Sequence, residues 1–89
     1  MMTVSELQDR IQSLPREQLA FLPTPLQFLP RLSRALGGPR ILIKRDDLTG
    51  LAFGGNKTRM FEYLLADARS QGADTVIGGA FIQSNYCRQ

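Results

Sequence analysis

The sequence contains no histidine and no tryptophan, and it has one cysteine, Cys87. A single cysteine cannot form an internal disulfide, and without histidine the common zinc ligands are nearly absent. We therefore expect neither a disulfide framework nor a bound metal, and a lone thiol favours a reducing, cytoplasmic setting. Cys87 itself is interpreted as a small buried hydrophobe.

Long runs of one residue type are missing too. Lys44-Arg45 is the longest basic run, and the net charge of +3 comes from interspersed signs, which argues against a nucleic-acid partner. No apolar stretch approaches the roughly 18 residues of a membrane span. Charged residues interrupt the first twenty positions, which argues against a signal peptide. We expect a protein that neither binds nucleic acid nor enters a membrane.

The composition is that of a folded protein, with 43% hydrophobic and 21% charged residues. The length of 89 residues allows at most one small domain or a piece of a larger one. A complete multi-substrate enzyme is therefore not expected from this chain alone.

Local signals predict two short helices in the first half. Thr3 and Glu6 have capping-box spacing ahead of an apolar helical pattern, and Pro15 should end that opening helix. Three prolines between residues 23 and 30 impose an extended path. A second short helix then closes at Gly37-Gly38.

The second half predicts alternating strands and helices. A β-branched run at 41–43 indicates a strand, and apolar residues at helical spacing indicate a helix between Asn56 and Gly72. Residues 73–79 resemble a buried strand, and 83–85 the start of another helix. This order is typical of an α/β protein with a parallel sheet. Since the last helix has barely one turn, we interpret the chain as an incomplete fragment.

Lys57 is the residue whose position most favours chemistry. It lies in the first turn of the predicted helix, where the macrodipole makes an ammonium mildly unfavourable. Gly78-Gly79 leads to a second polar helix start, so two helix N-termini should open at one sheet edge and suit an anion. By itself a lysine after a glycine turn is more often simply solvated. Adjacent Asp46 and Asp47 are interpreted as a turn signal more than as an acid/base pair.

Five segments in order resemble one enzyme family, that of D-cysteine desulfhydrase and 1-aminocyclopropane-1-carboxylate deaminase. The resemblance runs from Pro23 to Gln89 and implies pyridoxal phosphate as cofactor and a type II (tryptophan-synthase-β-like) fold. The segments are Thr24-Pro25-Leu26, Lys44-Arg45-Asp46-Asp47-Leu48, Gly54-Gly55-Asn56-Lys57-Thr58-Arg59, Gly72-Ala73-Asp74-Thr75-Val76 and Gln83-Ser84-Asn85.

The resemblance also implies roles for individual residues. Lys57 would carry the cofactor and, once freed, act as a base; Ser84 would transfer a proton or attack as a nucleophile; Asn85 would bind the cofactor hydroxyl or the substrate carboxylate. Tyr86 would contact the substrate, where relatives have His or Gln. Met60 stands where relatives often have a second lysine. These two departures bear on substrate choice.

The resulting hypothesis is a lyase or deaminase that releases ammonia from a small amino acid. Residues 1–22 would form a helical arm, and 23–89 a partial cofactor-binding domain, truncated at its C-terminus and inactive by itself. The family resemblance implies a homo-oligomer. The alternatives are a small basic anion-binding module or a non-catalytic remnant.

Overall fold

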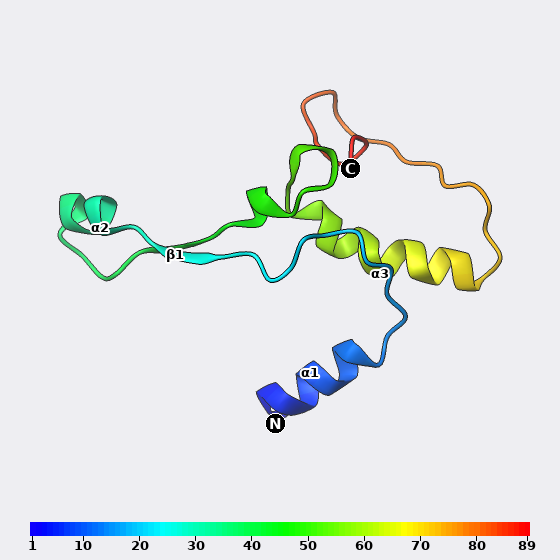
Figure 1. Cartoon of the computed structure of the whole chain (residues 1–89), viewed down its shortest axis with the longest axis horizontal. Coiled ribbons are helices and arrows are strands. Elements are labelled where there is room, and N and C mark those ends of the chain that lie inside the picture. Colours follow the sequence, from blue (N-terminus) through cyan, green and yellow to red (C-terminus); the bar gives the residue numbers. More distant parts are fainter.

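The computed structural model describes all 89 residues and contains three helices and one two-stranded sheet. The helices are α1 (Val4–Gln12), α2 (Pro30–Leu36) and α3 (Lys57–Ser70); the strands are β1 (Leu26–Phe28) and β2 (Leu42–Lys44). Two short 3-10 turns, η1 (Asp46–Leu48) and η2 (Leu51–Phe53), precede α3. The order of these elements is easily followed in Figure 1.

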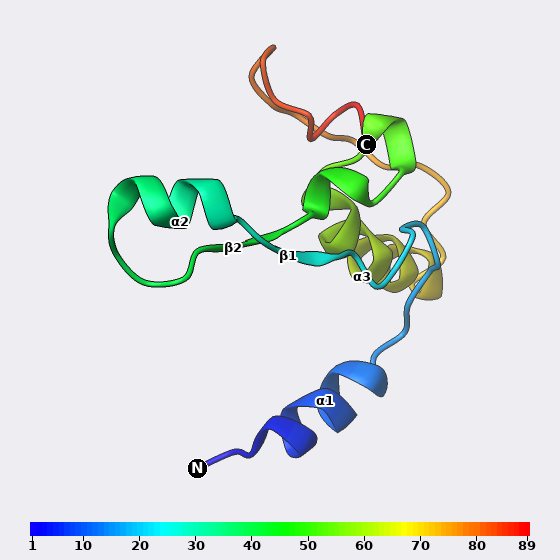
Figure 2. The same cartoon turned by 60° about the vertical axis from the view of Figure 1, so that its left-hand side comes forward.

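The opening helix α1 forms as the sequence predicts. The backbone amide of Glu6 donates to the Thr3 hydroxyl at 3.2 Å, and its carboxylate accepts from the Thr3 amide at 2.7 Å, which completes the capping box. The helix ends ahead of Pro15 and buries no residue. It extends away from the other elements in both views (Figures 1 and 2).

The sheet and α2 form an extension that projects from the rest of the chain. β1 and β2 pair antiparallel, with Leu26 opposite Lys44 and Phe28 opposite Leu42, and α2 lies at the far end of the loop that joins them. Gly37 adopts a left-handed φ of 60° and ends α2, as predicted. The observed pair is antiparallel because its two strands are joined through this local connection, whereas the predicted parallel sheet required a second strand at 73–79.

The ends of α3 also agree with prediction. The helix follows Asn56, although the Asn56 side chain makes no capping hydrogen bond. At the other end Gly72 has a φ of 80°, and the amides of Gly72 and Ala73 donate to Arg69 and Ala68, both at 3.0 Å. This is the 5→2 and 6→1 pattern with which a glycine ends a helix.

The buried face of α3 is not the one that the apolar spacing predicts. The apolar stripe consists of Met60, Phe61, Leu64, Leu65 and Ala68. Thr58, Glu62 and Ala66 are the buried residues of the helix, while Met60 and Leu64 are exposed. Residues at intervals of four lie on one side of a helix, so these three define a single face. This polar face is the buried one because the chain before β1 covers it. That chain offers Arg16 and backbone amides as hydrogen-bond donors to Glu62.

The predicted strand at 73–79 is absent. Its residues have no regular structure, and Val76 and Ile77 are exposed. A strand needs a neighbour for its amides and carbonyls, and β1 and β2 bond only to each other. The predicted final helix is limited to one turn, in which the amides of Arg88 and Gln89 donate to the Asn85 carbonyl at 3.1 and 3.0 Å.

Six of the 89 residues are buried, and the Cα radius of gyration is 16.8 Å, against about 12 Å for a compact domain of this length. Residues 73–89 run from the end of α3 back to its beginning, as Figures 1 and 2 both show. None of the helices combines the length and the apolar character that crossing a bilayer would require.

Candidate functional site

The loop before Lys57 is held by a buried threonine. The Thr49 hydroxyl accepts from the amide of Gly55 at 2.9 Å and donates to its carbonyl at 2.7 Å. Gly54 has a φ of 82°, and a side chain there would collide with the Asp47 carbonyl. The path of this loop therefore requires glycine at position 54 and a hydroxyl at position 49.

A polar cluster of Thr24, Asp46 and Arg59, here called the α3 clamp, holds the first turn of α3. Arg59 donates to both carboxylate oxygens of Asp46 at 2.8–3.1 Å and to the Thr24 hydroxyl at 2.7 Å. Thr24 in turn donates to Asp46 at 3.1 Å. Hydrogen bonding from Arg59 lowers the pKa of Asp46, so this carboxylate stays ionised.

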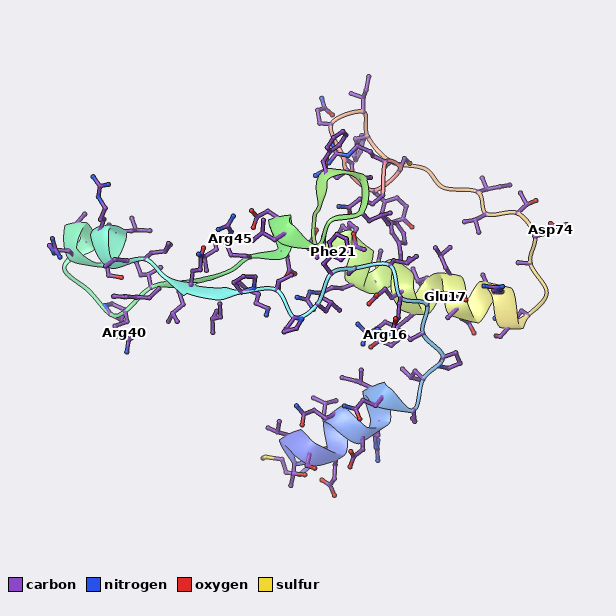
Figure 3. All side chains as sticks on the ribbon, viewed as in Figure 1. Arg16, Glu17, Phe21, Arg40, Arg45 and Asp74 are labelled. Atoms are coloured by element: carbon purple, nitrogen blue, oxygen red, sulfur yellow. The ribbon has the colours of Figure 1, made fainter.

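One turn further along α3, the buried carboxylate of Glu62 holds the preceding chain. It accepts two hydrogen bonds from Arg16, at 2.6 and 3.0 Å, and one each from the amides of Leu19 and Ala20. Burial acts to raise the pKa of Glu62, but these four donors outweigh it and the pKa is lowered. Figure 3 shows Arg16 and Glu17 beside α3. Residues 16–20 are thereby fastened to the helix that begins with Lys57.

Lys57 is half-buried, and its ammonium makes no hydrogen bond and no ion pair. Lys44 is the other lysine of the chain, and its Nζ donates to the Thr24 carbonyl at 2.6 Å. Of the two amines, that of Lys57 is therefore the one without a partner.

An open cavity of about 760 Å³ lies next to the start of α3. Gly55 and Asn56, which precede Lys57, line it together with Asn85 and Arg88 from the end of the chain. Lys57 follows Asn56 directly but does not itself line this cavity. The two predicted helix starts thus meet at one cavity, although no parallel sheet brings them there.

The other predicted site residues lie at the end of the chain. The Ser84 hydroxyl accepts from the amide of Tyr86 at 3.2 Å, so it caps the last turn. The Tyr86 ring meets Phe61 of α3 edge to face, with centroids 4.9 Å apart. Neither Ser84 nor Tyr86 contacts Lys57 through a hydrogen bond. Asn85 lines the cavity that Gly55 and Asn56, just before Lys57, also line.

The two acidic residues after β2 have separate partners. Asp46 belongs to the α3 clamp, and Asp47 pairs with Arg45 at 2.7 Å. Neither is free to work as part of an acid/base pair. The sequence did not predict the roles of Arg59 and Glu62. The one signal for a second buried face was the spacing of Thr58, Glu62 and Ala66, which are four residues apart and lie off the apolar stripe.

Comparison with known proteins identifies the family to which this chain belongs. The chain belongs to the family of pyridoxal-phosphate-dependent enzymes, whose family model matches residues 17–88. This confirms the pyridoxal-phosphate-dependent enzyme family that the sequence resemblance implied.

Individual relatives narrow the likeness. The chain is 57% identical over 75 residues to the D-cysteine desulfhydrases of Salmonella paratyphi B and Salmonella newport, which is 84% of this chain and 23% of each relative. It also matches a crystal structure of an ACC deaminase homologue, with a TM-score of 0.84 and 47% identity over 96% of this chain and 26% of that one. This likeness confirms the predicted fold family, although the strand predicted at 73–79 is not formed here, and the chain spans about a quarter of its relatives' length.

The residues around the start of α3 suit such a cofactor. Lys57 offers an unpaired amine, and the adjacent Thr58 hydroxyl is buried without a hydrogen-bond partner. The Gln89 amide, which lies against Gly55, is likewise buried and unpaired. Buried polar atoms ordinarily have partners. The unpaired amine of Lys57 and the unused hydrogen-bonding capacity of the Gln89 amide beside Gly55 fit a polar, aldehyde-bearing group.

Proposed function

We propose that Lys57 is the amine that carries pyridoxal phosphate, in an enzyme that releases ammonia from a small amino acid. The observation that supports this most directly is the state of the two lysines, since Lys44 is bound to Thr24 and Lys57 has no partner. The family model across residues 17–88 supports this proposal further, because an enzyme that uses pyridoxal phosphate needs a lysine amine to bind the cofactor aldehyde.

Other residues take roles that follow from their position. Asn85 shares a cavity with Asn56, and its amide can hold the cofactor hydroxyl or the substrate carboxylate there. Ser84 is proposed as a proton donor or nucleophile, which its capping role permits because its hydroxyl proton is not used in the bond to Tyr86. When bound, the cofactor supplies an electron sink for charge developing at the substrate Cα. The Lys57 amine, when free, accepts the Cα proton.

The substrate is proposed to be a small amino acid of the kind named by the relatives, D-cysteine or 1-aminocyclopropane-1-carboxylate. Tyr86 is proposed to bear on this choice because it stands where the resembled family has His or Gln; its ring packs edge to face on Phe61. Ammonia released together with sulfide from D-cysteine would identify a desulfhydrase. Ammonia from the cyclopropane substrate, without sulfide, would identify a deaminase.

We further propose that 1–22 is an arm and 23–89 part of the cofactor domain, that the enzyme is a cytoplasmic homo-oligomer, and that the 89-residue chain alone is inactive. The open framework with six buried residues supports the last point, because such a framework does not enclose a cofactor. Stable cofactor retention by the isolated chain would contradict it.

The decisive experiment uses the polypeptide in which this sequence naturally occurs, here called the natural-length protein. It is mixed with pyridoxal phosphate, reduced with borohydride and mapped by mass spectrometry. The label should be on Lys57, Lys57→Ala should remove it, and the control Lys44→Arg should retain it. A label on Lys44, or a wild-type protein that takes no label, would reject the assignment.

A further inference from the structure

We propose that Asp46 and Arg59 of the α3 clamp are positioning residues for Lys57, which direct its amine away from the packed side of α3. The inference rests on the proposed role of Lys57 as the cofactor amine. It assigns to Asp46, which lines the same cavity as Asn85, and to Arg59, which does not, the task of setting how the helix start is rotated.

The rotation follows from helix geometry. At 3.6 residues per turn, Arg59 lies about 200° around the axis from Lys57, and Glu62 about 140°. Both charged anchors therefore lie on the side of α3 opposite Lys57. Each is held by several hydrogen bonds to chain that is distant in sequence. When the anchors are held, the Lys57 side chain leaves the helix on the side that faces neither.

The clamp restrains rotation better than a single ion pair would. Arg59 binds Asp46 with two nitrogens, and a planar guanidinium that bonds both oxygens of a carboxylate has little freedom to pivot. Thr24 closes the cluster, because it donates to Asp46 and accepts from Arg59. Thr24 is buried, and its carbonyl accepts a hydrogen bond from Lys44, the last residue of β2. The first turn of α3 is thus tied to two separate chain segments.

A second arginine–carboxylate pair on the same helix provides a matched control. Arg69 donates to Glu17 at 3.0 Å near the other end of α3. This pair also joins the helix to the preceding chain, but it is three turns from Lys57 and far more exposed. A general requirement for attachment of that chain would make both pairs matter, whereas positioning of Lys57 requires only the clamp.

The test compares Asp46→Asn, Arg59→Lys and Glu17→Gln in the natural-length protein. The rate at which borohydride-trapped label accumulates on Lys57 is measured, together with the near-visible circular dichroism of the bound cofactor, which reports its orientation. A small misplacement of a reacting group costs on the order of a hundredfold, so Asp46→Asn should slow attachment by about that factor. Arg59→Lys should slow it less and Glu17→Gln by at most about twofold.

The near-visible signal separates positioning from stability. Asp46→Asn should weaken or invert it even at full cofactor occupancy, whereas a purely structural contact would lower the unfolding midpoint and leave that signal unchanged. A wild-type rate in Asp46→Asn, or equal slowing in Glu17→Gln, would overturn the proposal. Loss of the folded far-ultraviolet signal in both clamp variants would also overturn it, because the cluster would then serve folding alone. Failure of the wild type to take label on Lys57 would instead reject the proposed function.

Discussion

Residues 16–70 and residues 73–89 are held in different ways. In the first region, charged side chains with matched donors join segments more than forty positions apart, as Glu62 does with Arg16 and Leu19. In the second, beyond the Ala73–Ala68 hydrogen bond that ends α3, the contacts with the rest of the chain include an edge-to-face ring pair, an arginine over Phe53 and the approach of Gln89 to Gly55. The difference shows which interactions a short chain can complete by itself.

The buried carboxylate of Glu62 needs only a few hydrogen-bond donors, and the chain before β1 supplies them through Arg16 and two backbone amides. A buried parallel strand needs a whole neighbour on each side, and no segment of these 89 residues provides one for Val76 and Ile77. The buried residues are accordingly polar or small, while large apolar side chains stay exposed. Each prediction below alters one of the two regions in the natural-length protein.

Acid should have the largest effect, because it removes both carboxylate anchors at once. The folded-state pKa of Glu62 and that of Asp46 lie below the ordinary values of 4.5 and 3.8. Their contribution to stability is therefore complete above those values and is lost as the pH falls below them. Hydrogen exchange at the Leu19 and Ala20 amides should accelerate in this window beyond its intrinsic change with pH. The Ala73 amide, bound to a carbonyl, is the control; equal behaviour of all three would contradict the prediction.

Glu62→Gln should lower the free energy of unfolding by about 2–3 kcal/mol, measured in urea. The amide of glutamine puts a donor where Arg16 or the backbone already donates, so at least one buried donor is left unpaired. The matched control is Glu17→Gln, whose exposed pair with Arg69 should be worth about 0.5 kcal/mol or less. Comparable losses in the two variants would show that burial of Glu62 is unimportant.

Gly54→Ala should cost about 1–3 kcal/mol, because the left-handed φ of 82° and the nearby Asp47 carbonyl both oppose a side chain. Gly79→Ala is the matched change in the second region, where an added methyl group meets nothing within 4 Å and φ is not left-handed. It should stay within about 0.5 kcal/mol in the natural-length protein. Thermal unfolding of the natural-length protein measures both variants. An equal loss of unfolding free energy in Gly54→Ala and Gly79→Ala would contradict the expected difference between the two regions.

Tyr86→Leu should have the smallest effect, about 0.5–1 kcal/mol, since it removes one edge-to-face contact with Phe61 and keeps most of the apolar volume. Urea unfolding would measure it. A loss larger than that of Glu62→Gln would mean that the last residues are held far more strongly than their contacts indicate.

Local signals predicted the helices well. The capping box at Thr3 and the glycines at positions 37 and 72 each ended or began a helix as expected, because these devices act within a few residues. The buried face of α3 was not predicted. On its apolar stripe Phe61 meets the Tyr86 ring, but the fully buried residues are the polar series around Glu62, which is covered by chain about forty positions earlier.

The candidate site also has a part that the sequence predicted and a part that only the structure shows. Lys57, its glycine loop and the polar helix start at Ser84-Asn85 could be proposed from sequence because their residue types and order resemble one family. The α3 clamp could not, since Asp46 and Arg59 each have an ordinary local explanation, a turn and a helix surface. Only their approach in space shows that they bind each other.

The sequence by itself determined where the helices begin and end, where the glycine loop falls and which lysine follows it, because these depend on backbone preferences over a few residues. The tertiary structure decided which side of α3 is buried, which acid pairs with which arginine, and that residues 73–79 form no strand here. Those outcomes depend on partners that are distant along the chain, and hydrogen-bonding groups take the partners that the fold brings within reach.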